Sequence, residues 1–261
     1  MDSEIRQTAE FQVGATIGKR YEIVSHLGSG AMGLVLKVRD RALDNDVLAL
    51  KILYPHLLQD ETLFQRFMNE VVIARKLTHP NIVRTHDIGR DERGYYYISM
   101  EYIEGASLDT LVKAKSPALT PQNITRIIIQ TAMALEFAHS QGIIHRDIKP
   151  ANILIDKKGK VFLADFGLAK QLSGLDRSLT LSGTTMGTPE YMSPEQAMGK
   201  NDEVDARSDI FSLGATLYHC LAGRPPFRGK DLYAVLHKVI KVDPPLPRAL
   251  VRDVPRDLET I

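Results

Sequence analysis

The sequence is poor in several features that would mark particular protein classes. Cys220 is its only cysteine, so no disulfide can form within the chain, which fits a reducing cytosol. The net charge of +1 gives no indication of a nucleic-acid or anionic-membrane surface. No uncharged apolar run approaches the roughly 20 residues that a membrane-spanning helix needs. The first twenty residues lack an apolar core and so exclude a signal peptide. We therefore expect a cytoplasmic protein.

The composition, 44% hydrophobic and 25% charged over 261 residues, is typical of a globular protein with one two-part domain or two small ones. Residues 1–20 are interpreted as a polar leader. The first hundred residues then predict a small sheet, and a three-to-four-residue apolar period predicts one helix over residues 60–77. The strands of that sheet are expected at 21–27, 33–39, 47–53, 82–88 and 95–100.

After Gly105 the pattern becomes mainly helical. Thr120 followed by Pro121 is a helix-start signal, and an apolar stripe then continues to about Ser140. A second, buried helix is expected over residues 208–222. Short strands are predicted at 153–155 and 161–164, and a mobile loop rich in serine, threonine and glycine at 172–187.

One short segment, residues 145–152 (His-Arg-Asp-Ile-Lys-Pro-Ala-Asn), carries the most chemistry. Asp147 can accept a proton, Lys149 can hold a phosphate, and Asn152 can ligate a hard cation through oxygen. Asp165, in an Asp-Phe-Gly triplet, adds a second oxygen ligand. These are the groups that phosphoryl transfer requires, because its catalysis is mostly positioning and neutralisation of charge.

Gly28, Gly30 and Gly33 form a G-x-G-x-x-G pattern. A dinucleotide fingerprint would continue into a helix, but the residues after Gly33 predict a strand, which favours a strand-loop-strand phosphate flap over that fingerprint. An ordinary glycine-rich hairpin is the alternative. Lys51 ends an apolar strand and Glu70 lies in the predicted helix. Taken singly, Lys51 would be an edge charge and Glu70 part of a solvated face.

Together these motifs, with Ser193-Pro194-Glu195 after them, closely resemble the eukaryotic-type protein kinase family over about residues 21–261. The resemblance implies an α+β, two-lobed protein-kinase-like fold. Residues 21–102 would form a small ATP-binding lobe with an antiparallel sheet and one main helix. Residues 103–261 would form a larger, mainly helical lobe that is incomplete at its C-terminus.

The same resemblance assigns roles to the site residues. Asp147 would orient the acceptor hydroxyl and take its proton, while Asn152 and Asp165 would hold Mg²⁺. Lys51 would hold the ATP phosphates and be kept in place by Glu70. The expected nucleotide-binding residues, some of which plain core packing would equally explain, are Leu27, Gly28, Ser29, Gly30, Ala31, Met32, Gly33, Val35, Ala49, Lys51, Met100, Glu101, Ile103 and Leu154.

Lys149 and the Gly187-Thr188-Pro189 segment resemble the serine/threonine branch, most like the bacterial enzymes. Thr188 would bond Lys149 and Asp147, and Asp209 would bond the catalytic-loop backbone unless it is a helix cap. Ala151 and Ser107 predict no strong preference for basic substrates. Arg146 and Lys170 predict a phosphate in the loop, first at Thr184, then Ser182, Thr185 or Thr180; a loop that is never modified is the alternative.

Two features depart from the family. The relatives pair the residue matching Glu195 with an arginine in a later helical segment, so we expect such a segment to add stability here; in some bacterial relatives a membrane span follows. Ala74 is smaller than its usual counterpart, which would loosen the predicted helix.

The expected function is transfer of the γ-phosphoryl group of ATP to serine or threonine hydroxyls of protein substrates, with autophosphorylation through self-association, in signalling. A pseudokinase or scaffold is the first alternative, and a small-molecule kinase the second. No nucleic-acid partner and no membrane contact are expected within this segment.

Overall fold

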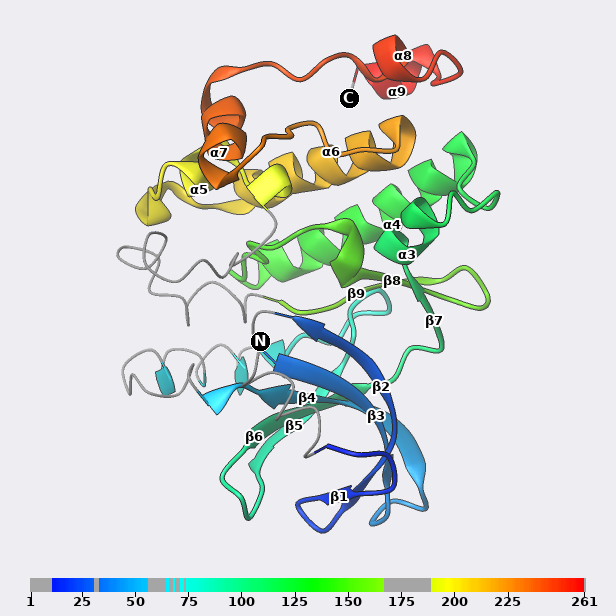
Figure 1. Cartoon of the computed structure of the whole chain (residues 1–261), viewed down its shortest axis with the longest axis vertical. Coiled ribbons are helices and arrows are strands. Elements are labelled where there is room, and N and C mark those ends of the chain that lie inside the picture. Colours follow the sequence, from blue (N-terminus) through cyan, green and yellow to red (C-terminus); the bar gives the residue numbers. More distant parts are fainter. Residues whose placement is uncertain are drawn as a thin grey trace. The chain divides into compact units, whose positions relative to one another are not determined.

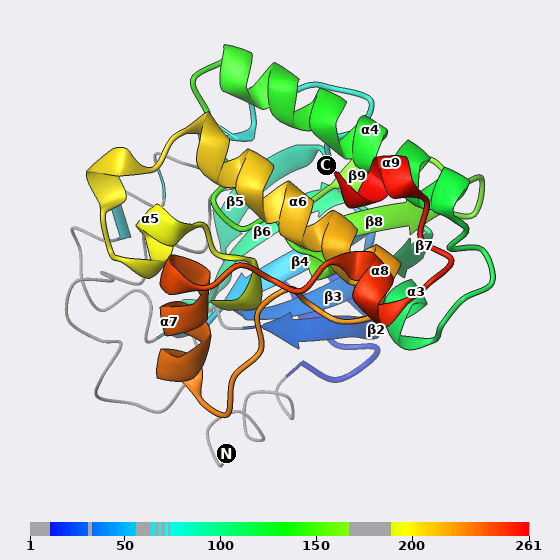
Figure 2. The same cartoon turned by 90° about the horizontal axis from the view of Figure 1, so that it is seen from above.

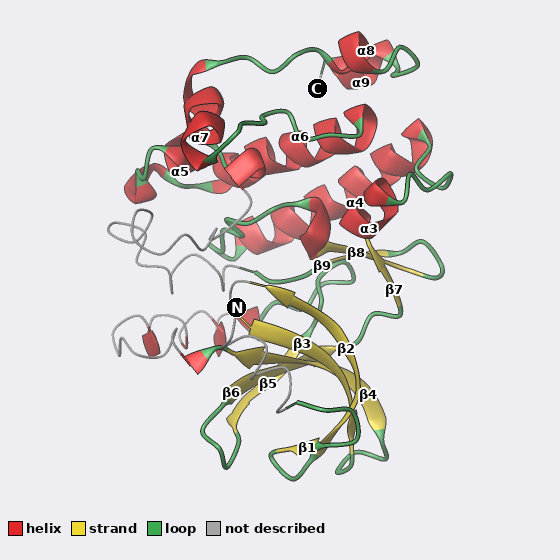
Figure 3. Ribbon diagram, viewed as in Figure 1, coloured by secondary structure: helices red, strands yellow, loops and turns green. Residues whose placement is uncertain are grey.

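The computed structural model describes residues 11–30, 33–55, 64–65, 68, 71–72, 74–166 and 189–260. The chain divides into two compact units. Unit 1 comprises Met1–Thr78 and Val83–Ile103, and unit 2 comprises His79–Ile82 and Glu104–Ile261. Figure 3 shows that the described part of unit 1 consists mostly of strands and that of unit 2 mostly of helices.

Unit 1 is built on a six-stranded antiparallel sheet with the strand order β1-β2-β3-β4-β6-β5 (Figure 1). Neighbouring strands in the chain pair directly, except that β5 lies at the edge and β6 pairs with β4. The strands are β1 (Thr16–Ile17), β2 (Tyr21–Gly30), β3 (Gly33–Asp40), β4 (Asp46–Leu53), β5 (Thr85–Arg90) and β6 (Tyr96–Glu101). The predicted small antiparallel sheet is confirmed.

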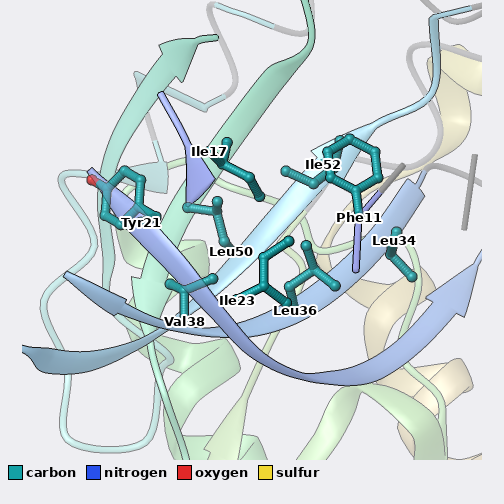
Figure 4. Close-up of a cluster of buried hydrophobic side chains, with 9 residues drawn as sticks. All are labelled: Phe11, Ile17, Tyr21, Ile23, Leu34, Leu36, Val38, Leu50 and Ile52. Carbon is teal, nitrogen blue, oxygen red and sulfur yellow. The ribbon is translucent and has the colours of Figure 1, made fainter. Parts of the chain in front are cut away.

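One face of this sheet carries the hydrophobic core of unit 1. Leu34, Leu36 and Val38 alternate along β3 and are all buried, as the two-residue period of a strand requires. Leu50 and Ile52 of β4 join them. Figure 4 shows these side chains converging with those of Phe11, Ile17, Tyr21 and Ile23. The intervening residues of β3 therefore face the other side of the sheet.

The expected polar leader is wrong for its described part, residues 11–20. Phe11 and Ile17 are only 2% and 0% exposed, and both belong to the core of unit 1. Ile17 also pairs with Tyr21, so β1 adds a strand to the sheet. Arg20 forms an ion pair with the fully buried Asp40 at 2.6 Å. Two widely spaced apolar residues were enough to anchor a segment whose overall composition is polar.

The helix expected over residues 60–77 lies largely outside the described residues. Residues 64–65, 68, 71–72 and 74 are helical. Val71 and Leu77 are buried, with exposures of 0% and 2%. These positions agree with the predicted apolar stripe, and the looseness expected from Ala74 stays a prediction.

The longest helices of unit 2 are α4 (Pro121–Ser140) and α6 (Ala206–Ala222), which lie side by side in Figure 2. Thr120 caps α4 by accepting a hydrogen bond from the backbone N–H of Asn123, and Pro121 occupies the first turn, as the sequence predicts. Asp205 caps α6, and Gly223 ends it in the left-handed conformation that glycine favours. Both predicted helices are confirmed.

A three-stranded antiparallel sheet, with the order β7-β8-β9, accompanies these helices. Its strands are β7 (Gly105–Ser107), β8 (Ile153–Asp156) and β9 (Val161–Leu163). The predicted strands correspond to β8 and β9, whereas β7 was not predicted because its residues, Gly-Ala-Ser, include no β-branched or aromatic side chain. The remaining α-helices described in unit 2 are α3 (Leu108–Lys113), α5 (Pro194–Ala197), α7 (Leu232–Lys241), α8 (Pro247–Leu250) and α9 (Arg256–Glu259).

Four residues between β5 and the preceding part of unit 1, His79–Ile82, belong to unit 2. The Asn81 side chain donates to Gln130 of α4 at 3.1 Å and to the carbonyl of Val161 at 2.8 Å. Its carbonyl accepts from the Leu163 N–H at 2.8 Å. Asn81 thus ties this short segment to a helix and a strand of unit 2. Among the described helices, none is both long and apolar enough to cross a bilayer.

Candidate active site

The face of the unit 1 sheet opposite the core gathers four of the expected nucleotide-binding residues. Val35 pairs with Lys51, and Ala49 pairs with Met100. Residues directly opposite in an antiparallel pair share a face. Val35, Ala49, Lys51 and Met100 therefore form one surface, with Lys51 only 5% exposed.

The glycine pattern lies where β2 ends and β3 begins, so the expected strand after Gly33 is confirmed. Leu27, Gly28, Ser29 and Gly30 belong to β2. A Cβ atom at Gly28 or Gly30 would meet nothing within 4 Å, whereas one at Gly33 would lie 1.8 Å from the carbonyl oxygen of Ile52. Gly33 is therefore required by the close approach of β3 and β4, a reason that the motif itself does not reveal.

The segment after β6 contains the two residues expected to bond an adenine edge, Glu101 and Ile103. The backbone N–H of Glu101 already donates to the Arg84 carbonyl at 2.9 Å. Glu101 would therefore have only its carbonyl to offer a nucleotide. Ile103 is half-buried and ends unit 1.

In unit 2, three of the expected catalytic side chains meet at one carboxylate. Lys149 Nζ lies 2.8 Å from Asp147 Oδ2, and Asn152 Nδ2 donates to the same oxygen at 3.1 Å. Asn152 also donates to the Asp147 backbone carbonyl at 2.8 Å. Asp147 Oδ1 takes part in none of these contacts. The predicted grouping of Asp147, Lys149 and Asn152 is present, and it restrains one of the two carboxylate oxygens.

Asn152 and Asp165 are joined through the backbone. The N–H of Ala164, the residue before Asp165, donates to the Asn152 carbonyl at 2.9 Å. Because the Asn152 amide nitrogen faces Asp147, its side-chain oxygen makes neither of those bonds. Asp165 has φ = 61°, a left-handed conformation. An amide oxygen and a carboxylate are the kind of ligands that a hard cation such as Mg²⁺ prefers.

His145 links the two ends of this region. It is fully buried and its Nε2 contacts the Ala164 carbonyl at 2.9 Å, while the Asp147 N–H donates to its Nδ1 at 3.3 Å. A carbonyl can only accept and a backbone N–H can only donate, so Nε2 donates to the Ala164 carbonyl and Nδ1 accepts from the Asp147 N–H. Its ring also packs against Phe166, with centroids 4.6 Å apart.

Asp209 of α6 holds the catalytic segment by accepting hydrogen bonds from its backbone. Its carboxylate accepts from the N–H groups of His145 at 2.8 Å and Arg146 at 2.7 Å, and contacts His139 Nε2 at 2.8 Å. Burial acts to raise the pKa of Asp209, but these donors outweigh it, so the pKa lies below its ordinary value. Asp209 bonds the catalytic segment as expected, and the helix cap is Asp205 instead.

Arg146 is fixed in an unusual conformation by two partners. Its φ of 66° is left-handed, which costs free energy for a residue with a Cβ. Asp209 binds its N–H, and Gln196 Nε2 donates to its carbonyl at 3.0 Å. Sequence reasoning missed Gln196, although its place three residues after Ser193 is a capping-box signal, and its Oε1 accepts from the Ser193 N–H at 3.2 Å.

Glu195 accepts a hydrogen bond from the Ser208 hydroxyl of α6. Burial acts to raise the pKa of Glu195, but the Ser208 bond and nearby backbone donors bring it below its ordinary value. Ser208 thus supplies a neutral donor at the residue for which an arginine partner was expected. The effect of a further helical segment on stability stays a prediction.

The remaining expected residues are placed as follows. Leu154 lies in β8, opposite Ser107 and Phe162. The expected residues Ala31, Met32, Glu70, Gly167, Lys170, Thr180, Ser182, Thr184, Thr185 and Thr188 lie outside the described residues.

His219 of α6 makes unit 2 sensitive to acid. Its Nδ1 contacts the hydroxyl of the buried Tyr191, and burial, with Arg228 and Lys113 nearby, lowers its pKa despite the opposing effect of Asp109. The unfolded chain then binds a proton that the folded chain does not, so the free energy of unfolding should fall as pH drops below about 6.5. Urea denaturation at pH 7.5 and 5.5 measures this.

His219→Gln should reduce the pH dependence, because the titrating ring is gone. His237→Gln, at an exposed histidine of α7, is the matched control and should leave the pH dependence unchanged. An unaltered pH profile in His219→Gln would contradict the assignment.

Comparisons with known proteins agree with this geometry. The protein kinase domain model matches residues 21–250. The chain is 41% identical over 248 residues to the serine/threonine-protein kinase PknB of Mycolicibacterium smegmatis, covering 94% of this chain and 39% of that protein. It is 39% identical over 241 residues to the serine/threonine-protein kinase pkn3 of Myxococcus xanthus, covering 90% of this chain and 43% of that protein.

Among solved structures, the PknI kinase domain of Mycobacterium tuberculosis matches with a TM-score of 0.71 and 31% identity, covering 93% of this chain and 85% of that one. The chain spans 39% of the length of the curated PknB relative that it matches. With the fold, the Asp147 cluster and the match over residues 21–250 in agreement, the chain belongs to the protein kinase family.

Proposed function

We propose that this chain is the catalytic segment of an ATP-dependent protein kinase that phosphorylates serine and threonine hydroxyls. The observation that carries the proposal is the Asp147 carboxylate, with Oδ2 restrained by Lys149 and Asn152 and Oδ1 outside those contacts. The named relatives of the chain are serine/threonine-protein kinases.

Asp147 would orient the acceptor hydroxyl and accept its proton as the oxygen attacks the γ-phosphorus of ATP. The bond from that phosphorus to the β–γ bridging oxygen would break, and ADP would leave. Lys149, already beside Asp147, would offset negative charge gathered on the transferring group. Lys51, on the shared face of the unit 1 sheet, would bind the ATP phosphates. Val35 and Ala49 would contact the adenine ring, and Met100 would line the back of its pocket.

Mg²⁺ is the proposed metal, because Asn152 and Asp165 offer oxygen ligands. When bound, it would supply positive charge that neutralises the phosphate oxygens. Asn152 would hold it through the side-chain oxygen opposite the amide nitrogen that donates to Asp147.

We further propose that the partners are proteins with serine or threonine acceptors, that copies of the chain phosphorylate one another, and that the segment works in the reducing cytosol. Thr184 is the first proposed acceptor in the chain itself. No strong basic preference is proposed, and a peptide array with a dominant arginine requirement would contradict it.

ATP consumption with Mg²⁺ and a generic protein substrate tests the proposal, with phosphoserine and phosphothreonine identified by mass spectrometry. Phosphate transfer to protein hydroxyls is the expected result. Nucleotide binding without ATP consumption would favour a pseudokinase instead. Transfer to a small molecule, with none to protein, would favour the other alternative.

A further inference from the structure

A lysine that the motifs do not include lies on the proposed nucleotide face of unit 1. Lys37 of β3 pairs with Ala49 of β4, which in turn pairs with Met100 of β6. Paired residues in adjacent antiparallel strands share a face, so these three form one row across the sheet. Val35, Lys51 and Ile98 form the adjacent row. Lys37 therefore lies two residues from Val35, on the side away from the glycine turn.

The ammonium group of Lys37 contacts an aromatic ring. Its Nζ lies 4.4 Å from the ring centroid of Tyr102, which follows Met100 by two residues. This distance is within the range of a cation–π interaction. Both side chains are half-buried, so the interaction is only partly screened by water. In the described part of the chain, no carboxylate lies within ion-pair distance of Lys37.

Tyr102 stands between Glu101 and Ile103, the two residues whose backbone groups would bond the adenine edge. The segment between the end of β6 at Glu101 and the start of β7 at Gly105 belongs to no helix or strand. Arg84 restrains it on one side by accepting from the Glu101 N–H. Lys37 would add a second restraint by holding the ring of Tyr102.

We infer that Lys37 and Tyr102 are a positioning pair that fixes residues 101–103 for binding the adenine base. The inference depends on the proposed function, because it assumes that the base binds to this face. A rigid segment loses less freedom when a ligand binds, so the pair raises affinity without touching the transferred phosphate. Loss of the pair should therefore raise the Kd and the KM for nucleotide and leave kcat unchanged.

Lys37→Met keeps the length and the apolar stem of the side chain but removes the charge. The expected result is a Kd for ATP that is larger by about three- to tenfold, measured by isothermal titration calorimetry. Lys37→Arg and Tyr102→Phe preserve the cation and the ring, so both should bind within about twofold of the unchanged protein. Tyr102→Leu should match Lys37→Met, and the double variant should be no weaker than either single one.

The matched control is Lys160→Met. Lys160 makes the same kind of contact, 4.6 Å from the ring centroid of Phe162, but within unit 2. It should leave nucleotide affinity unchanged, and circular dichroism should show all variants folded.

Titrations with ATP, ADP and adenosine separate a positioning role from a phosphate contact. A positioning pair weakens all three by the same factor, whereas a loss confined to ATP would overturn the inference. Equal affinity in Lys37→Met and the unchanged protein would also overturn it, while the proposed function would stand. If the unchanged protein bound no adenine nucleotide, the proposed function itself would fail and the inference with it.

Discussion

Asp147→Asn is expected to lower kcat by about 10²- to 10⁴-fold, because an amide cannot accept the proton of the substrate hydroxyl. The substitution preserves the shape of the side chain. Its amide oxygen can occupy the position of Oδ2, where Lys149 at 2.8 Å and Asn152 at 3.1 Å supply donors. The fold and the KM for ATP should therefore change little. Steady-state phosphorylation of a generic protein substrate measures both constants.

Asp202→Asn is the matched control for that experiment. Asp202 is an exposed aspartate in the short helical turn η4 (Asn201–Glu203), and its substitution should leave kcat unchanged. A kcat in Asp147→Asn within about twofold of the control would contradict the role of Asp147 as the proton acceptor.

Asp209→Ala is expected to reduce the free energy of unfolding by about 3–5 kcal/mol, the range for removing one partner of a buried charged network. The side chain is 1% exposed and contacts three donors, which alanine would leave buried without an acceptor. Activity should fall as well, because the Arg146 N–H would lose the bond to Asp209 that helps to hold Arg146 in its left-handed backbone conformation. Urea denaturation followed by circular dichroism gives the stability change.

Asp205→Ala offers a control on the same helix. Asp205 caps α6, but its side chain is 49% exposed and its partner Arg207 is 86% exposed. A surface pair of this kind contributes little, so a much smaller loss is expected. Asp209→Asn should be intermediate, since it keeps one acceptor oxygen but turns an amide N–H toward a backbone donor. Similar losses in Asp205→Ala and Asp209→Ala would show that Asp209 is no more than an ordinary helix residue.

Local sequence signals were sufficient for much of the fold. Helix α4 was predicted because Thr120 and Pro121 mark its start and an apolar stripe follows, and strand β3 because it is rich in valine and leucine. The short strand β1 was missed because two residues carry no measurable period. Phe11 was missed for a related reason: its burial depends on residues from β2, β3 and β4, not on its neighbours in the chain.

In the candidate active site, too, the residues with local sequence signals were predicted and those that depend on distant contacts were not. Asp147, Lys149 and Asn152 were recognisable because they lie within six residues of one another in a known pattern. His139 was not, since it acts through Asp209, which lies 70 residues further along the chain. No local pattern connects the two. Lys37 was equally invisible, because its partner Tyr102 becomes a neighbour only when β3, β4 and β6 pair in register.

The placement of His79–Ile82 has a practical consequence for building chimeras between related kinases. A hybrid joined once, after Ile103, would take Asn81 from one parent and Gln130 and Val161 from the other. Unless both parents have compatible residues there, the graft would leave the buried Val161 carbonyl without its Asn81 donor, and Gln130 Oε1 would keep only the Val161 N–H. A sound exchange therefore transplants two pieces of sequence, the four-residue insert together with everything after Ile103.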